Sequence, residues 1–487
     1  MRVSTPLAPS IRLSRRRALQ LGGSAGALAS FGLAGAQLTT PAKAQTSAQS
    51  SATPLPLHIQ RARYAIADQP TDDLISTRPD GPPPVTRLKQ GQPFAARVTN
   101  TLPDYTAMHW HGIRLDNAMD GVPYLTQFPI GEGESFDYHF TPMDAGTYWY
   151  HPHCMTMNQM AMGLTGVLVV EEAEDPGFNA DIALNLRDFR LRPSGEWLKL
   201  WTARGAARSG TFGTIITANW DSDPIYEAPT GGLVRLRLAA TDTARIYKPY
   251  VAGVPGQVIA ADGHPLREAI DWPTDQAPAM LSPGQRLDIA VQMPRIEGAY
   301  VDVMTAFPGG PRRLARIRAT GPSLGRELAE LPPLPANNVP EPDLGNARVE
   351  DLVFGWTPEG GAPQNGYCGS LGYTFWSINR KPWPGDAADP DTPGADPLAV
   401  LNRGESVILR LRNESPNAHP IHLHGLVFRP LRSNKRRLPS NWTDTALLLK
   451  DEIIEVALVA DNSGDWAFHC HVIEHQKTGL AGYIRVT

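Results

Sequence analysis

Cysteine is scarce in this chain of 487 residues, which contains only Cys154, Cys368 and Cys470. Three cysteines exclude the disulfide framework by which many small secreted domains compensate for a small hydrophobic core. Cys154 and Cys368 could pair with each other, but the sequence does not show how far apart they lie in space. Two buried thiols are the interpretation that the sequence favours, and a disulfide is the alternative.

Long hydrophobic runs are absent as well. The most apolar stretch, residues 19–38, is weakly hydrophobic and is interrupted by five glycines. Elsewhere the chain has no segment that reaches the roughly 18 apolar residues that a membrane-spanning helix needs. We therefore predict no stable insertion into a membrane.

The N-terminal segment is similar to an export signal. Ser14-Arg15-Arg16-Arg17 resembles a twin-arginine motif and precedes the apolar stretch, and Ala42-Lys43-Ala44 places small residues at the two positions that a signal peptidase reads. We predict a signal peptide at residues 1–44 and export to the periplasm by the twin-arginine route. A membrane anchor is the alternative interpretation.

An excess of positive charge is also missing. Residues 1–44 carry six lysines and arginines and no aspartate or glutamate, so the rest of the chain has 39 basic and 49 acidic residues. This balance argues against nucleic acid as a partner, because binding to phosphates is driven by basic side chains. The negative charge suits a cationic or metal-ion substrate, and it suits simple solubility equally well.

Proline and glycine are abundant, at 46 and 44 residues, and favour short strands joined by turns. The length suggests three domains of about 150 residues each. One plan occurs twice, near the two ends of the chain: a β-rich run leads into a pair of histidines, and a second such run leads into another pair. The repeated segments are 94–100 before 108–112, 146–150 before 151–153, 407–413 before 419–425, and 464–468 before 469–471.

The repeat predicts two copies of one β-sandwich. Alternating runs such as 233–238 predict a third sandwich between them. The predicted divisions are the signal peptide at 1–44, a first sandwich at 45–175, a metal-free spacer sandwich at 176–330, a proline-rich linker at 331–345, and a last sandwich at 346–487. The only histidine of the middle region, His264, lies in a turn signal and is predicted to be structural.

Ten of the 13 histidines fall in four clusters. The clusters are His109-Trp-His111, His151-Pro-His153, His419-Pro-Ile-His422-Leu-His424, and His469-Cys470-His471 with His475. On a strand, side chains two residues apart share a face, so each His-x-His presents two imidazoles together, and Cys470 points away from its two neighbours. Three adjacent residues can thus serve two metal centres. A single His-x-His is more often an ordinary surface or core feature; four clusters reverse that balance.

In their order and spacing the four clusters resemble the multicopper oxidase family, which includes laccases and bacterial cuprous oxidases. The resemblance covers nearly the whole chain after residue 44. It implies an all-β fold of three cupredoxin-like Greek-key β-sandwich domains and a cofactor set of four copper ions, one type 1, one type 2 and two type 3. The implied ligands are His419, Cys470 and His475 for type 1 copper, His109 and His422 for type 2, and His111, His151, His153, His424, His469 and His471 for the type 3 pair.

Many members have a methionine as the axial neighbour of type 1 copper, and here Leu480 stands at that position. Loss of a thioether donor is expected to raise the reduction potential of type 1 copper, because the axial group is one of the factors that set the potential of a blue-copper site. The alternative is that Leu480 is only a core residue and that Met162 or another methionine approaches the site.

The resemblance also implies the reaction. One-electron donors are oxidised at the Cys470 site, electrons pass to His469 and His471, and O2 is reduced to two waters. Asp120 corresponds to an acid near type 2 copper, although an ordinary Asp-Gly turn explains it almost as well. Relatives often have glutamate directly after the last type 1 ligand, where this chain has Gln476, which cannot titrate. Either Glu474 or a water chain replaces it, or the reaction depends more on Asp120.

The substrate is less well defined. Met155, Met157, Met160 and Met162 follow the second cluster, and thioethers suit Cu(I). They could bind Cu(I) as substrate in a copper-tolerance role, or they could be flexible core filling. Phenols are the competing donors, and a copper-free relative of the same fold or a two-domain nitrite reductase are the competing functions. We expect a monomer with O2 and a small donor as its partners.

Overall fold

The computed structural model describes residues 53–487 except 272–273, 276–277, 357, 359–367 and 384–395. The predicted signal peptide lies outside the described residues. By their contacts, residues 50–487 form one unit. Among the described helices, none has the length and apolar character to cross a membrane.

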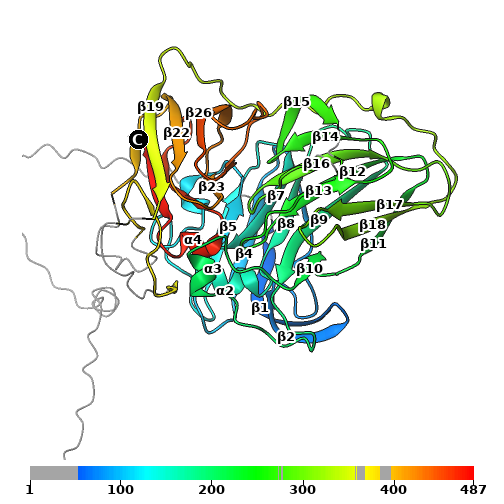
Figure 1. The fold of residues 1–487 in the computed structure, drawn as a ribbon, viewed down its shortest axis with the longest axis horizontal. Coiled ribbons are helices and arrows are strands. Elements are labelled where there is room, and N and C mark those ends of the chain that lie inside the picture. Colours follow the sequence, from blue (N-terminus) through cyan, green and yellow to red (C-terminus); the bar gives the residue numbers. More distant parts are fainter. Residues whose placement is uncertain (1–52, 272–273, 276–277, 357, 359–367, 384–395) are drawn as a thin grey trace, which may run out of the picture. The chain divides into compact units, whose positions relative to one another are not determined.

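The described chain forms six β-sheets, and the all-β prediction is confirmed (Figure 1). Each consecutive third of the chain supplies two of the sheets. The first pair is β2 (Gln69–Ser76), β1 (Leu55–Ile66), β4 (Phe94–Asn100) and β6 (Ser135–Phe140) in one sheet, and β3 (Thr86–Lys89), β8 (Gly166–Glu171), β7 (Gly146–Pro152) and β5 (Met108–His111) in the other.

The second pair comes from the middle of the sequence. Its sheets are β10 (Ile215–Ala218), β9 (Ala180–Phe189), β12 (Leu233–Ala240), β16 (Arg286–Gln292), β14 (Gly256–Ala261) and β15 (His264–Asp271), and β11 (Ile225–Pro229), β18 (Arg312–Thr320), β17 (Tyr300–Thr305) and β13 (Pro249–Val251). The predicted boundaries at residues 175, 330 and 345 fall between strands of different pairs. Whether each pair is an independent domain stays a prediction.

The third pair comes from the last part of the chain. Its sheets are β20 (Ser377–Ile378), β19 (Arg348–Gly355), β22 (Ser406–Asn413), β26 (Ile453–Val459) and β24 (Arg429–Ser433), and β21 (Ala399–Leu401), β28 (Ala481–Val486), β27 (Gly464–Cys470), β23 (His419–Leu423) and β25 (Thr445–Leu448). The short helices are η1 (Asn117–Met119), α2 (Thr156–Ala161), α3 (Ala203–Ala206), η2 (Leu328–Glu330) and α4 (Ile473–Gln476).

The internal repeat corresponds to a repeated topology. The sheet order β3-β8-β7-β5 is matched by β21-β28-β27-β23, and in both sheets the first two strands are parallel and the remaining pairs antiparallel. The register pairs His109 with His151 in the first copy and His422 with His469 in the second. The histidine clusters therefore stand on neighbouring strands in each copy.

One hydrophobic core joins the first and last pairs of sheets. It includes Trp110 and Leu168 from the first and Leu423 and Phe468 from the last, all at most 1% exposed. The middle pair has a separate core around Leu236. Burying side chains from both ends of the chain in one cluster removes apolar surface from water, and it brings the two copies of the repeat together.

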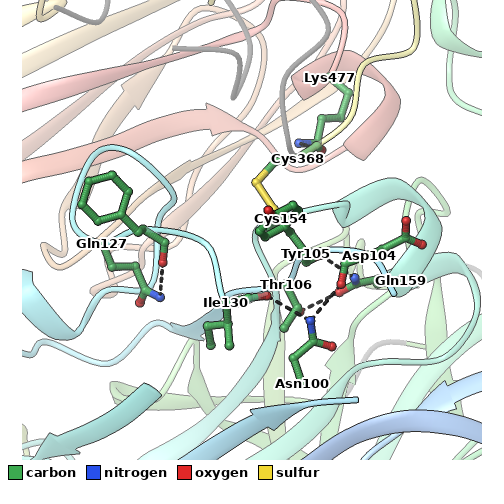
Figure 2. Close-up of a disulfide and its surroundings, with 11 residues drawn as sticks. Asn100, Asp104, Tyr105, Thr106, Gln127, Ile130, Cys154, Gln159, Cys368 and Lys477 are labelled. Carbon is green, nitrogen blue, oxygen red and sulfur yellow. Dashed lines mark hydrogen bonds between the residues drawn. A yellow bond between two sulfur atoms is a disulfide. The ribbon is translucent and has the colours of Figure 1, made fainter. Parts of the chain in front are cut away.

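Cys154 and Cys368 form a disulfide, so the favoured interpretation of two buried thiols is wrong (Figure 2). The bond joins the end of the second histidine cluster to a segment 214 residues later, with the Cα atoms 4.5 Å apart. A backbone hydrogen bond from Met155 N–H to the Cys368 carbonyl, at 3.2 Å, supports the same contact. Cys470 is a free, buried thiol.

His264 has the structural role that its turn signal predicts. It is 1% exposed, and its Nδ1 accepts a hydrogen bond from the Asn337 amide, 3.2 Å away in the proline-rich linker. Burial lowers the pKa of His264 to about 4. The folded state therefore holds this ring neutral in a pH range in which the unfolded chain protonates it.

Acid is expected to destabilise the protein through His264. The folded pKa lies below the unfolded value of 6.5, so its stabilising contribution is complete above pH 6.5 and is lost as pH falls toward 4, at about 3 kcal/mol in total. Urea unfolding between pH 7 and pH 4 should show that His264→Gln loses less stability than the wild type. Parallel pH profiles for the two proteins would contradict this account.

Candidate metal centres

Three donor atoms converge where the third and fourth histidine clusters meet. The Cys470 Sγ lies 3.6 Å from His419 Nδ1 and 3.5 Å from His475 Nδ1, and the two nitrogens are 3.0 Å apart. β23 and β27 pair so that Ile421 faces Cys470, and α4 carries His475 back toward the sulfur. This triangle of one sulfur and two imidazole nitrogens has the donor set of a blue-copper site.

The triangle is sealed from water. His419, Cys470 and His475 are each 0% exposed. Burial raises the pKa of the Cys470 thiol, and burial lowers the pKa of His475 to about 3. The ring nitrogens that face the sulfur are therefore held unprotonated, and a bound metal ion would supply the positive charge that favours the Cys470 thiolate.

Leu480 lies beside this triangle. Its carbonyl accepts from the Cys470 N–H at 3.0 Å, its own N–H donates to the His475 carbonyl at 3.0 Å, and its side chain is fully buried. Met162 instead has its sulfur 3.9 Å from Arg61 Nη1. Leu480 therefore adjoins two of the three donor residues through its backbone, and its role as axial neighbour stays a prediction.

The other eight histidines form a second group, next to the first. β5, β7, β23 and β27 supply five of them, and the other three lie one residue beyond the ends of β7, β23 and β27. The ring nitrogens form sets within 4.8 Å of one another. The sets are His109, His111 and His422; His111, His151 and His471; and His153, His424 and His469. Every ring in these sets is at most 4% exposed. The predicted convergence of both ends of the chain is present.

Unpartnered nitrogens show that this group suits metal ions. Within the described part of the chain, six of the eight rings bury a nitrogen that has no hydrogen-bond partner; they are His109 Nε2, His111 Nδ1, His151 Nε2, His153 Nδ1, His422 Nε2 and both nitrogens of His471. In the remaining two rings, His424 Nε2 faces His469 Nε2 at 3.0 Å. A buried polar atom without a partner is costly, so nitrogens gathered in this way fit a coordinated cation.

The second nitrogen of most rings is held by an oxygen. His109 Nδ1 and His422 Nδ1 donate to the backbone carbonyls of Asp120 and Asp444, both at 2.9 Å. The Asp120 carboxylate accepts from His424 Nδ1 at 2.9 Å. Such acceptors fix the tautomer and orientation of a ligand ring, so that its other nitrogen faces the metal.

Comparison with known proteins decides the family. Two models described as multicopper oxidase match residues 58–175 and 371–487. A solved multicopper oxidase from Pseudomonas thermotolerans is 36% identical, with a TM-score of 0.78, over 90% of this chain and 100% of that one. The chain belongs to the multicopper oxidase family.

Two further relatives support the assignment. A multicopper oxidase structure from Pseudomonas parafulva is 35% identical, with a TM-score of 0.77, over 89% of this chain and 100% of that one. Multicopper oxidase MmcO of Mycobacterium tuberculosis is 29% identical over 449 residues, which is 84% of this chain and 82% of MmcO. The protein is thus a copper-binding oxidoreductase that uses O2, and its sheets are those of cupredoxin-like domains.

The multicopper oxidase has one buried carboxylate that the sequence did not reveal. Asp444 Oδ1 lies 3.2 Å from His111 Nε2, and the carboxylate accepts from Arg286 Nη1 at 2.9 Å and Nη2 at 2.7 Å. Burial alone would raise the pKa of Asp444, but the Arg286 guanidinium and His111 hold it well below its ordinary value. The middle pair of sheets, predicted to be only a spacer, therefore reaches the histidine group through Arg286.

The buried Glu474 carboxylate is held by Thr211. Its carboxylate accepts from the backbone N–H of Thr211, and from the Thr211 hydroxyl at 2.7 Å. Burial raises the pKa of Glu474. Glu474 is thus anchored to Thr211, and its catalytic role stays a prediction. The Gln476 amide reaches His153 Nε2 at 3.4 Å.

The four methionines of the predicted Cu(I) site have different surroundings. Met160 is fully buried and Met157 is 3% exposed, and both pack with Trp149 in an apolar cluster. Met155 and Met157 also line a cavity of about 80 Å³ with Trp201. Met155 and Met157 share this cavity, and Met160 and Met162 do not line it.

Proposed function

We propose that this multicopper oxidase holds four copper ions and couples four one-electron oxidations to the reduction of O2 to two waters. The copper ions, when bound, supply the one-electron redox chemistry. The observation that carries the proposal is the pair of neighbouring centres: a Cys-His-His triangle and an eight-histidine group. His469 and His471 belong to the second group and are bonded in the chain to Cys470 of the first.

Each copper ion has its own proposed set of ligand residues. We assign His419, Cys470 and His475 to type 1 copper, and His109 and His422 to type 2. We assign the remaining six clustered histidines to the type 3 pair. The peptide bonds on either side of Cys470 give electrons a short covalent path from its sulfur to both neighbouring imidazoles.

Asp120 is the proposed proton donor. It is 1% exposed, its Oδ2 accepts from His424 Nδ1, and its Oδ1 lies 3.2 Å from His109 Nδ1. A carboxyl group in this position could deliver protons to reduced oxygen through a water molecule. Gln476 supplies no proton, so we infer that turnover depends strongly on Asp120.

The proposal also covers the cellular location and the physiological role of the protein. The twin-arginine motif supports export to the periplasm, and the acidic mature chain supports a cationic donor as well as solubility. We propose Cu(I) or phenols as donors, with a role in copper tolerance if Cu(I) is the donor. Relatives of the chain named laccase favour the phenol alternative.

Purified, copper-loaded protein tests this function directly. The proposal expects intense blue colour and O2 uptake when Cu(I), Fe(II) or a phenolic dye is added. Colourless protein without O2 uptake would identify a copper-free relative of the same fold. The donor with the highest kcat/KM identifies the substrate class.

Met155 and Met157 are expected to matter only if Cu(I) is a substrate. The double replacement Met155→Leu/Met157→Leu nearly conserves volume, so the fold should be retained. Loss of two soft sulfur ligands should raise KM for Cu(I) by about tenfold and leave kinetics with a phenolic dye unchanged. Met160→Leu, inside the core, is the matched control. Unaltered Cu(I) kinetics in the double variant would remove the methionine site.

A further inference from the structure

The outer edges of both type 1 imidazoles are closed. His419 Nε2 donates to the Ser415 hydroxyl oxygen at 2.8 Å, and His475 Nε2 donates to the Arg208 carbonyl. Neither ring has any exposed surface. An organic donor therefore has no direct contact with the rings that carry electrons to Cys470.

Residues 202–213, which lie between β9 and β10, contribute to this closure on the His475 side. The indole N–H of Trp376 donates to the Ala206 carbonyl at 2.7 Å, and Ser209 Oγ donates to Asn417 Oδ1 at 3.3 Å. Thr211 is held by the Glu474 carboxylate, and Arg208 by His475. Four attachments to the last pair of sheets fix the segment in place.

Two tryptophans connect the closed rings to the surface. The Trp376 ring is fully buried, and its centroid lies 4.9 Å from that of His419 and 4.6 Å from that of His475. The Trp356 ring stands edge-on to Trp376, with centroids 5.4 Å apart, and is 44% exposed. These rings form a continuous aromatic path from solvent to both type 1 imidazoles.

The sheet explains why the two indoles meet. β19 and β20 are antiparallel, with Phe354 opposite Ile378 and Gly355 opposite Ser377. Trp356 follows β19 directly and Trp376 precedes β20 directly, so the same register places them opposite each other. Cross-strand neighbours of this kind are close enough for aromatic contact.

We propose that Trp356 is the docking platform for an electron-rich aromatic donor, such as a phenol, and that Trp356 and Trp376 carry its electron to His419 and His475. This inference rests on the proposed oxidase function. The donor stacks on the exposed indole, and the π systems of the two tryptophans bridge the sealed layer. Cu(I) ions have no ring to stack and do not use this platform.

The electrons balance with the oxidase reaction. Each phenol loses one electron and releases its hydroxyl proton to solvent, which leaves a phenoxyl radical. Each tryptophan passes on every electron that it receives and ends unchanged. Four donors supply four electrons, and O2 takes them up with four protons to give two waters.

Variants of Trp356 test the platform, with the exposed residue Tyr373 as a matched control. Tyr373 is 43% exposed and stacks on Phe375. Trp356→Leu should lower kcat/KM for a bulky phenol by about tenfold, and Trp356→Phe, which keeps a ring, by less than Trp356→Leu. Cu(I) oxidation by both variants, and phenol oxidation by Tyr373→Leu, should match the wild type.

A second readout does not depend on turnover. In copper-free protein, the same phenol should quench tryptophan fluorescence, and this binding should be lost in Trp356→Leu and kept in Tyr373→Leu. Equal phenol kinetics or equal phenol binding in the two leucine variants would overturn the proposal. So would a wild type that oxidises Cu(I) but no phenol. Failure of the wild type with every donor would instead reject the oxidase function itself.

Discussion

Replacing Cys470 with serine is expected to remove the blue colour and to slow the oxidation of every donor by at least about 10³-fold. The sulfur of Cys470 is the soft donor of the triangle with His419 and His475, at 3.6 and 3.5 Å. A serine hydroxyl is a hard donor that stays protonated at neutral pH. No other described thiol can replace it, because the remaining two cysteines are joined in the disulfide.

The eight-histidine group should survive this substitution. His469 and His471 keep their backbone positions on β27 and just after it, so the Cys470→Ser protein should lose one copper and retain the others. Copper analysis, visible absorbance and O2 uptake measure the three effects. The double variant Cys154→Ser/Cys368→Ser is the control and should stay blue. A blue, active Cys470→Ser protein would show that the triangle of His419, Cys470 and His475 is not the blue-copper site.

Replacing Asp444 with asparagine is expected to cause the second large effect. Arg286 is fully buried, and its two terminal nitrogens donate to the Asp444 carboxylate. After this change Asp262, with its Oδ1 3.4 Å from Arg286 Nη1, is the carboxylate that remains beside the buried guanidinium, and loss of one partner of a buried ion pair is expected to cost about 3 kcal/mol. His111 loses its carboxylate acceptor at the same time, which should weaken copper binding by about 10–100-fold.

A second substitution separates these two consequences. In Asp444→Asn/Arg286→Met the guanidinium is gone, and Asp262, whose pKa burial raises to about 7, can take up a proton, so part of the lost stability should return. Copper affinity should remain low, because His111 still lacks the carboxylate. Denaturant unfolding and copper titration are the two measurements. Wild-type stability together with wild-type copper affinity in Asp444→Asn would contradict the role of this pair.

The sequence predicts which histidines gather with Cys470 because strand geometry is local. His109 and His111 share a strand face by their spacing, and the alternation around Cys470 assigns His469 and His471 to one centre and the thiol to another. Both assignments follow from the two-residue alternation of side chains along a strand. The repeat around the clusters then predicts two similar sheets, and β7 and β27 have the expected neighbours.

The outer contacts could not be predicted because they depend on tertiary proximity. Asp444 and Arg286 are 158 residues apart, and neither stands in a motif. The partner of Cys154 lies 214 residues away. The bond between Glu474 and the Thr211 hydroxyl spans 263 residues and has no signal in the sequence. Met157 and Met160 share a helix face at three-residue spacing, and that face is buried.

Anomalous diffraction at the copper edge, with the copper content of the same crystals, tests the central claim most directly. That claim is the convergence of histidines from both ends of the chain beside Cys470. The account predicts four copper peaks, three among the eight histidines and one between His419, Cys470 and His475. A single peak, or copper bound away from these residues, would contradict it.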